Sequence, residues 1–189
     1  MTNENDILRK YAIIRAIKTI LTQPNKRFSI VGLANEAKMA PSAASYSLDY
    51  MVDNNIVNKQ IIGNTHQYQA NLENCVTRQW KILFSIQEIK KTRIVDEILK
   101  KTKNVSSIVL YGSIASGTDD DRSDWDILVI ADTKRTSEMF GRTAIEGREI
   151  NMQIYTPVEW RKKAHEQKAF YDNVVLHSIP LYGDKPVIL

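Results

Sequence analysis

The feature that most constrains the fold is a pair of aspartates at the start of an apolar segment. Asp124 and Asp126 stand directly before ILVIA, in the sequence DWDILVIA. A carboxylate that enters a hydrophobic core is costly unless something pairs with it, and two neighbouring carboxylates also repel each other. The chain therefore has to fold so that a shared proton or a bound cation resolves this repulsion.

Apolar strands are expected on both sides of a short polar segment. VSSIVLYGS ends in Gly112 and Ser113, and WDILVIA follows a polar loop, TDDDRS. Both apolar segments are typical of buried strands. Between them, Ser113 is expected to cap a short helix that Gly117 ends. Gly112 would let a phosphate approach the backbone, and the amides after Ser113 would face that anion.

The alternation of side chains along a strand aims the two aspartates together. Asp124 and Asp126 should lie on one face, and Trp125 and Ile127 on the other. Mg²⁺ suits such a pair, because it takes oxygen ligands from one or two carboxylates and completes its shell with water and phosphates. The segment thus predicts a magnesium site beside a phosphate site.

The charge of the chain is unevenly distributed. The formal net charge of +4 divides into +3 over residues 1–72, +4 over residues 73–104 and −3 over residues 105–189. These ranges are interpreted as one domain, a helical connector and a second domain. The basic residues 1–104 suit a nucleic-acid partner, and the acidic residues 105–189 suit a metal. Such small excesses of charge are also found on helices whose charged side chains only contact solvent.

Residues 5–72 carry the signals of three helices followed by a hairpin. An apolar stripe predicts a helix over residues 5–22, and further helices are expected up to Lys38 and from Pro41, which suits a first helical turn. The segment VNKQIIGNTHQYQAN predicts a hairpin with its turn at Gly63. In this order of elements the segment resembles the winged helix-turn-helix family.

This resemblance implies double-stranded DNA as a partner, with docking to a protein as the alternative. The second helix would enter a major groove, and the hairpin would lie near the backbone or the minor groove. That helix carries Asp49 and Asp53 and no Lys or Arg, so its electrostatic attraction for DNA is weak. The candidate DNA-binding residues are Ser42, Ser45, Tyr46, Asn64 and His66.

Residues 73–103 contain neither Gly nor Pro and are rich in Lys, Ile and Leu. Their apolar periodicity predicts one bent helix or two helices, which would space the domains or join two chains. The sequence VEWRKKAHEQKAFYDNVVLHS predicts further helix near the end of the chain, followed by IPLYGD.

The second domain resembles the polymerase-β-like nucleotidyltransferase superfamily, especially its minimal and aminoglycoside-modifying members. The resemblance rests on Gly112-Ser113, a ten-residue interval, and Asp124-Trp125-Asp126 with apolar residues after it. It implies an α/β (α+β) fold, a small mixed sheet with helices on one side. The reaction implied is attack by a substrate oxygen on the α-phosphorus of a nucleoside triphosphate, with release of pyrophosphate.

The same resemblance implies residue roles. Asp124 and Asp126 would hold two Mg²⁺ ions that stabilise the attacking and leaving oxygens. Gly112 and Ser113 would hold the β and γ phosphates, and Arg122 could add positive charge near them.

A third carboxylate is normally supplied by a later strand in that superfamily, and here the strand is REINMQIYT. If Glu149 takes this position, the carboxylate triad is complete. If Asn151 takes it, as its place in the middle of the strand favours, an amide oxygen can still ligate Mg²⁺ but lacks charge and cannot take a proton. The alternating residues Ile150, Met152 and Ile154 are expected in the core.

Two main functions follow from the sequence, and a toxin-antitoxin type partner that modifies another protein is a third alternative. The first is a Mg²⁺-dependent nucleotidyltransferase, and the alternative is a transcriptional regulator whose second domain binds a nucleotide and transfers nothing. A homodimer is expected because winged helices commonly bind paired half-sites. A cytoplasmic location without membrane contact is expected, because the N-terminus is polar and no apolar run of about 18 residues occurs.

Overall fold

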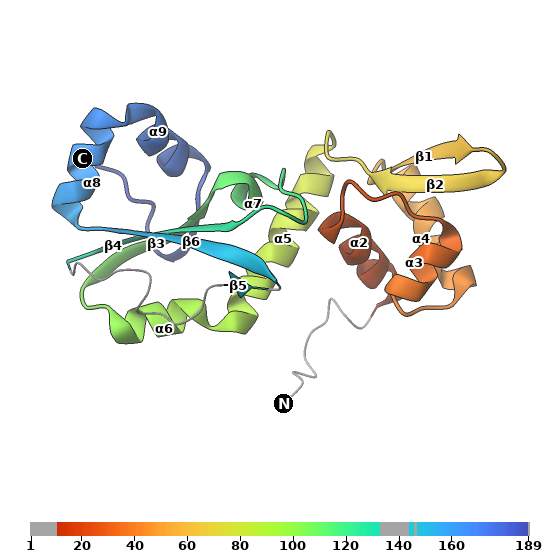
Figure 1. The fold of residues 1–189 in the computed structure, drawn as a ribbon, viewed down its shortest axis with the longest axis horizontal. Helices are drawn as coiled ribbons and strands as arrows, with labels where there is room; N and C mark the ends of the chain where they lie inside the picture. Colours follow the sequence, from red (N-terminus) through yellow and green to blue (C-terminus); the bar gives the residue numbers. More distant parts are fainter. Residues whose placement is uncertain (1–10, 133–143, 146, 189) are drawn as a thin grey trace. The chain divides into compact units, whose positions relative to one another are not determined.

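The computed structural model describes residues 11–132, 144–145 and 147–188. The chain divides into two compact units, Met1–Lys81 and Ile82–Leu189, and each unit is described by itself. Figure 1 shows the elements of both units. In the described residues, no helix is both long enough and apolar enough to cross a membrane.

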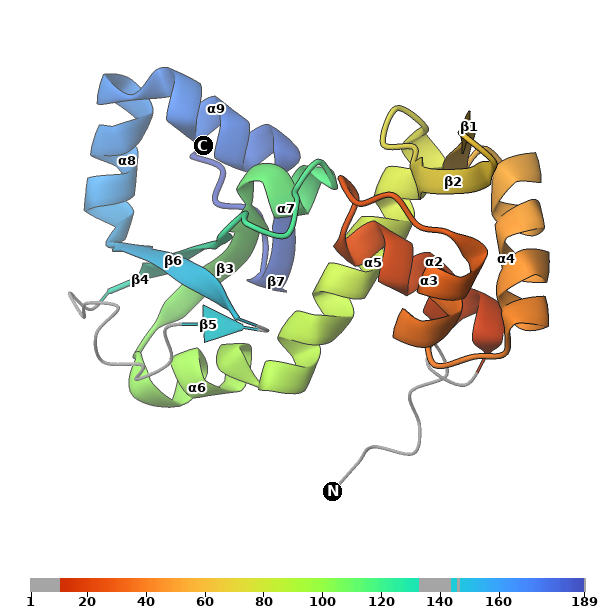
Figure 2. The ribbon, with the colours of Figure 1, turned by 45° about the vertical axis from the view of Figure 1, so that its right-hand side comes forward.

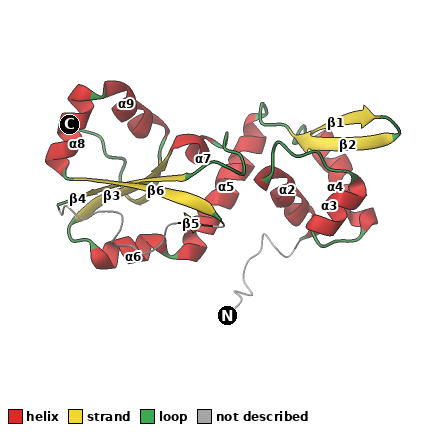
Figure 3. Cartoon of the chain, in the orientation of Figure 1, coloured by secondary structure: helices red, strands yellow, loops and turns green. Residues whose placement is uncertain are grey.

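The first unit has the element order of a winged helix (Figure 3). Helices α2, α3 and α4 are followed by an antiparallel hairpin of β1 and β2. Their bounds are α2 Ala12–Thr22, α3 Ile30–Glu36, α4 Pro41–Asp53, β1 Val57–Ile62 and β2 Thr65–Ala70. The expected helix over residues 5–22 is confirmed from Ala12 onward, and its first residues lie outside the described part of the chain.

Local sequence explains where these elements begin and turn. Pro41 occupies the first turn of α4, where its missing amide donor costs no hydrogen bond. Ser29 caps α3 by accepting a backbone hydrogen bond. Gly63 has a φ of +59° in the turn between β1 and β2. Phe28 and Tyr68 pair through an isolated bridge, which ties the start of α3 to the hairpin.

The core of the first unit is built from the apolar stripes of its helices. On α4, Ala44, Leu48 and Met51 have no exposed surface. Among the described residues of this unit, further fully buried large side chains are those of Phe28, Ile17, Ile20, Leu21 and Leu33.

The helical segment between the hairpin and the sheet consists of two helices, α5 (Cys75–Thr92) and α6 (Ile94–Lys101). Arg93 separates them in the left-handed conformation, with a φ of +56°. The division between the two units falls within α5. Ile94 and Ile98 of α6 are completely buried in the core of the second unit.

The second unit is built on a mixed sheet with the strand order β5-β6-β4-β3-β7 in the described residues. The β4–β6 pair is parallel, and the other pairs are antiparallel. The bounds are β3 Val105–Tyr111, β4 Trp125–Ala131, β5 Ala144–Ile145, β6 Arg148–Tyr155 and β7 Ile179–Gly183.

Helices cover both faces of this sheet, so the expectation of helices on one side is wrong. Figure 2 shows α6 on one side and α8 (Pro157–Glu166) with α9 (Lys168–His177) on the other. The physical reason is that α6 has an apolar face of its own, which Ile94 and Ile98 bury against β3 and β4 side chains. A separate core, with Trp160 and Val174, lies under α8 and α9.

The short helix α7 (Gly112–Ser116) connects β3 to the loop before β4. The expectation that Ser113 caps it is wrong, because the N-cap residue is Tyr111 and no side chain makes a capping bond. The helix begins two residues earlier than expected, since Gly112 itself turns the chain with a φ of +76°. Its expected end is confirmed, with Gly117 in the left-handed conformation at a φ of +68°.

Candidate functional site

Asp126 lies where β3, β4 and β6 run side by side. It is the second residue of β4, and it pairs in register with Tyr111 on β3 and with Asn151 on β6. The neighbouring residues Trp125 and Ile127 are buried in the core on the α6 side of the sheet. Because side chains alternate, Asp126 lies on the opposite face, together with Tyr111.

Gly112 closes the turn after β3 directly against the Asp126 carboxylate. A Cβ atom added at Gly112 would overlap the Oδ2 atom of Asp126. The φ of +76° also lies in the region that side chains with a Cβ rarely adopt. Both the backbone conformation and the space at this turn therefore require glycine.

Asn151 is the residue on β6 that contacts Asp126. Its Nδ2 atom donates a hydrogen bond to Asp126 Oδ1, at 2.9 Å. Glu149 lies two residues earlier on the same strand, is exposed, and pairs in register with Ala144 on β5. Of the two residues considered for the third position, the amide rather than the carboxylate lies against Asp126.

The surroundings of Asp126 disfavour its negative charge. Burial raises the pKa of the Asp126 carboxyl, and the negative charge of Asp124 raises it further, while the hydrogen bond from Asn151 acts in the opposite direction. The pKa of the neighbouring Tyr111 is also raised, first by burial and then by the charge of Asp126. A cation at this position would relieve the unfavourable charge.

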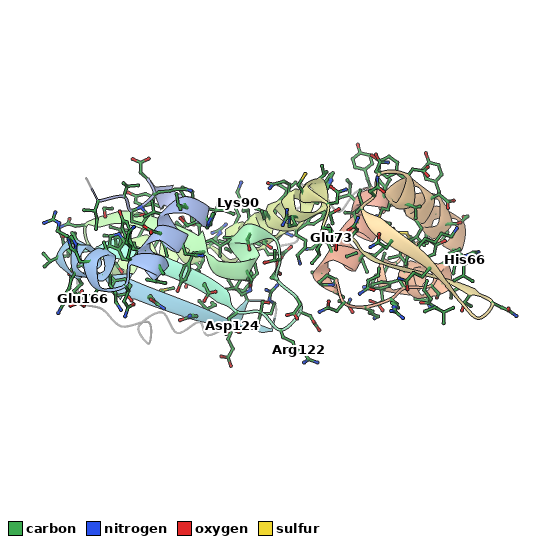
Figure 4. All side chains as sticks on the ribbon, turned by 90° about the horizontal axis from the view of Figure 1, so that it is seen from above. His66, Glu73, Lys90, Arg122, Asp124 and Glu166 are labelled. Carbon is green, nitrogen blue, oxygen red and sulfur yellow. The ribbon has the colours of Figure 1, made fainter. Side chains whose placement is uncertain are left out.

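Asp124 and Arg122 lie on the loop between α7 and β4, and both are exposed. Figure 4 shows both side chains projecting outward along the same margin of this unit. Ser113 is half-buried in α7. The structure thus brings Gly112 and Asp126 into contact, and it leaves Asp124 and Arg122 accessible to solvent.

The oxygen donors of Asp124, Asp126 and Asn151 suit a hard cation. In the described part of the chain, no group of three or more His, Cys, Asp or Glu side chains is arranged to hold a metal ion. The available set is therefore the carboxylates of Asp124 and Asp126 with the amide of Asn151. Mg²⁺ fits this set, because it needs only one or two protein carboxylates when phosphates and water supply the remaining ligands.

The candidate DNA-binding residues lie on α4 and the hairpin of the first unit. Ser42 and Tyr46 are exposed on α4, and Ser45 is half-buried. Asn64 lies in the turn between β1 and β2, and Figure 4 shows His66 on the hairpin. The exposed face of α4 also carries Asp49 and Asp53.

Sequence reasoning missed two residues beside the site. Arg148 at the start of β6 donates through Nη1 to Asp119 Oδ2, at 3.1 Å, and the Asp119 side chain is only 3% exposed. The sequence signal that could have identified them was an arginine at the first position of a half-buried strand and an aspartate in the loop that leads to Asp124. Neither residue type alone identifies its partner.

We expect Gly112→Ala to destabilise the protein more than Gly147→Ala does. Gly147 has a similar φ of +79°, but an added Cβ there meets nothing within 4 Å. Both variants carry the backbone cost, about 1–2 kcal/mol, and only Gly112→Ala adds the overlap with Asp126, about 1–3 kcal/mol more. Urea unfolding of both variants measures the difference, and equal losses would contradict the close contact.

We expect Asp126→Asn to stabilise the protein at pH 7 in EDTA. A raised pKa means that the folded state disfavours the carboxylate, so stability is lost as the pH rises from below the ordinary value of 3.8 through the raised pKa. The asparagine can still accept from Asn151 and does not titrate in this range.

Thermal unfolding from pH 3 to pH 7 tests this expectation. The melting temperature of Asp126→Asn should exceed that of the wild type by a margin that grows as the pH rises. Asp121→Asn, at an exposed carboxylate in the loop before β4, is the matched control. A wild type that gains stability over the variant toward pH 7 would contradict it.

Solved structures with some likeness to this chain include regulators and DNA-binding proteins. The AntR antimony-specific transcriptional repressor is 20% identical with a TM-score of 0.36, covering 45% of this chain and 75% of that chain. Sso10a-2, a DNA-binding protein from Sulfolobus solfataricus, is 17% identical with a TM-score of 0.34, and the match covers 45% of this chain and 93% of that chain. A possible transcriptional regulator from Methanosarcina mazei Go1 is 15% identical with a TM-score of 0.32, and the match covers 49% of this chain and 78% of that chain. No function is inferred from likeness at this level.

No curated protein matches the chain. The family model described as polymerase beta, nucleotidyltransferase, does match it, over residues 93–186. The matched range contains the turn at Gly112, both aspartates and the strand that carries Asn151. Residues 93–186 therefore form a domain of the polymerase beta nucleotidyltransferase type.

Proposed function

We propose that this chain is a Mg²⁺-dependent nucleotidyltransferase that moves a nucleoside monophosphate from a nucleoside triphosphate to an acceptor. An oxygen of the acceptor forms a bond to the α-phosphorus, the bond to the pyrophosphate group breaks, and the acceptor loses its proton. The observation that supports this function best is the contact of the Gly112 turn with Asp126, inside the range that matches the family.

The proposed metal ligands are the carboxylates of Asp124 and Asp126, with the amide oxygen of Asn151 as a further donor. When bound by these residues, Mg²⁺ would neutralise the charge of the phosphates and stabilise the charge that develops during transfer. The raised pKa of the Asp126 carboxyl supports this assignment, because an uncompensated negative charge is unfavourable there.

The proposed phosphate contacts come from the turn and the loop on either side of the aspartates. Gly112 lacks a side chain, so a phosphate can approach the backbone at the turn. Ser113 can donate a hydroxyl hydrogen bond, and Arg122 is exposed and carries a positive charge that suits an anion. These residues bind and orient the triphosphate, which is most of what a protein contributes to phosphoryl chemistry.

The amide at position 151 limits this reaction. Asn151 cannot accept the proton that the acceptor oxygen loses, whereas a carboxylate at this position could. Its hydrogen bond to Asp126 at 2.9 Å holds the second carboxylate in place instead. Slow transfer is therefore expected, with the proton passing to solvent.

A second function, a regulator that binds a nucleotide without transfer, is favoured by the same amide. In this proposal the winged helix of the first unit would bind double-stranded DNA as a homodimer, through the exposed face of α4 and the hairpin. Because α4 carries no Lys or Arg and exposes Asp49 and Asp53, phosphate attraction would have to come from other elements.

Transfer of label from a nucleoside triphosphate separates the two functions. Each of four α-labelled triphosphates is incubated with Mg²⁺, cell extract and the wild type, Asp126→Asn, or Asn151→Asp. We expect labelled acceptor with the wild type, none with Asp126→Asn, and about 10²-fold faster labelling with Asn151→Asp, because a positioned base typically contributes 10²–10⁴-fold.

Asn173→Asp, at an exposed amide on α9, is the matched control for the added charge. Labelling that persists in Asp126→Asn would contradict the proposed transferase. Nucleotide binding without labelling, in both the wild type and Asn151→Asp, would favour the regulator.

A further inference from the structure

We propose that Arg148 is a positioning residue that sets the place of Asp124 relative to Asp126. This inference rests on the proposed metal and nucleotide site and adds to it a residue from outside the expected motif. Arg148 opens β6, the strand that also carries Asn151. Its guanidinium contacts the loop on which Asp124 lies.

The guanidinium makes two hydrogen bonds to that loop. Its Nε donates to the carbonyl oxygen of Ser123, at 2.5 Å, and its Nη1 donates to Asp119 Oδ2, at 3.1 Å. The Arg148 side chain is 15% exposed and the Asp119 side chain 3%. The first bond acts on the residue that directly precedes Asp124.

A third contact acts on the residue that directly follows Asp124. The Arg148 guanidinium lies over the Trp125 ring, 5.2 Å from its centroid, and the ring is buried. The indole Nε1 in turn donates to the carbonyl oxygen of Ile145 on β5, at 3.2 Å. One side chain therefore contacts both neighbours of Asp124 in the sequence.

The loop also has internal hydrogen bonds that keep its shape. Asp120 Oδ1 accepts from the Arg122 amide at 3.0 Å and from Ser123 Oγ at 3.1 Å, and Ser123 Oγ accepts from the Asp120 amide at 3.0 Å. These bonds form a compact turn but do not join it to the sheet. The Arg148 contacts join this turn to β6, whose Asn151 holds Asp126.

The pattern of contacts requires an arginine. Two donors at a fixed angle and a flat face for the indole ring are properties of a guanidinium, and the compact ammonium of lysine has neither. Asp119 is almost fully buried, so its negative charge also depends on a close cation. We infer that loss of the guanidinium releases the loop and lets Asp124 move with respect to Asp126.

Two variants separate positioning from folding. Arg148→Lys keeps a positive charge near Asp119 and loses the paired donors. The double variant Asp119→Leu/Arg148→Met removes both charges, so that no unpaired charge remains buried. Arg161→Met, at an exposed arginine on α8, is the matched control. Far-ultraviolet circular dichroism and cooperative unfolding establish that each variant folds.

The test has two readouts, both on the full chain. Hydrogen exchange without ligand reports the amides of residues 118–124, and electron paramagnetic resonance of Mn²⁺ with ATP reports affinity, since Mn²⁺ takes the same oxygen ligands as Mg²⁺. We expect loop amides to exchange at least about tenfold faster in both variants, and affinity to fall about 10- to 100-fold, as for other residues that orient metal ligands. The control should match the wild type in both.

The outcomes distinguish this inference from the proposed function. Unchanged loop exchange in both folded variants would overturn the positioning role. So would unchanged affinity, if the wild type binds Mn²⁺ with ATP and Asp126→Asn does not. A wild type that binds Mn²⁺ with ATP no better than Asp126→Asn would overturn the proposed site itself, and the positioning role with it.

Discussion

The carboxylate of Asp126 is the point on which the second unit depends. It lies near the start of β4, between the backbone of Gly112 and the amide of Asn151, which donates to it at 2.9 Å. Burial makes its charge unfavourable, and the nearby charge of Asp124 makes it more so. The fold keeps an unfavourable group at its margin, which is typical of sites that bind a cation or perform chemistry. Asp126 lies within residues 93–186, the range that matches the nucleotidyltransferase family model.

The sheet explains how residues far apart in sequence meet at this point. β4 lies between β3 and β6, so the turn after β3 and the middle of β6 both face the start of β4. Apolar side chains on one face of the sheet pack against α6, and those on the other face pack against α8 and α9. Two covered faces make the central strands rigid, and rigid strands hold polar groups at their ends with little freedom. The site therefore depends on both cores, including the one formed by α6.

Much of this arrangement could be predicted from the sequence, because it follows from local patterns. The apolar run after Asp126 predicts a buried strand, and β4 spans Trp125–Ala131 as expected. Alternation placed Ile150 and Met152 toward the core, and both pack there. The third position on β6 could not be fixed, since pairing register depends on neighbouring strands rather than on β6 itself. For the same reason Arg148 was missed: its contacts join segments 25 and 29 residues away in the chain.

The central claim is that the two aspartates bind a divalent metal together with a triphosphate. A crystal structure with Mg²⁺ and a non-hydrolysable nucleoside triphosphate tests it most directly. The account predicts a metal at about 2.0–2.1 Å from oxygens of both Asp124 and Asp126, with the phosphates against the turn at Gly112. A triphosphate bound elsewhere, or crystals in which this margin stays empty at saturating ligand, would contradict it.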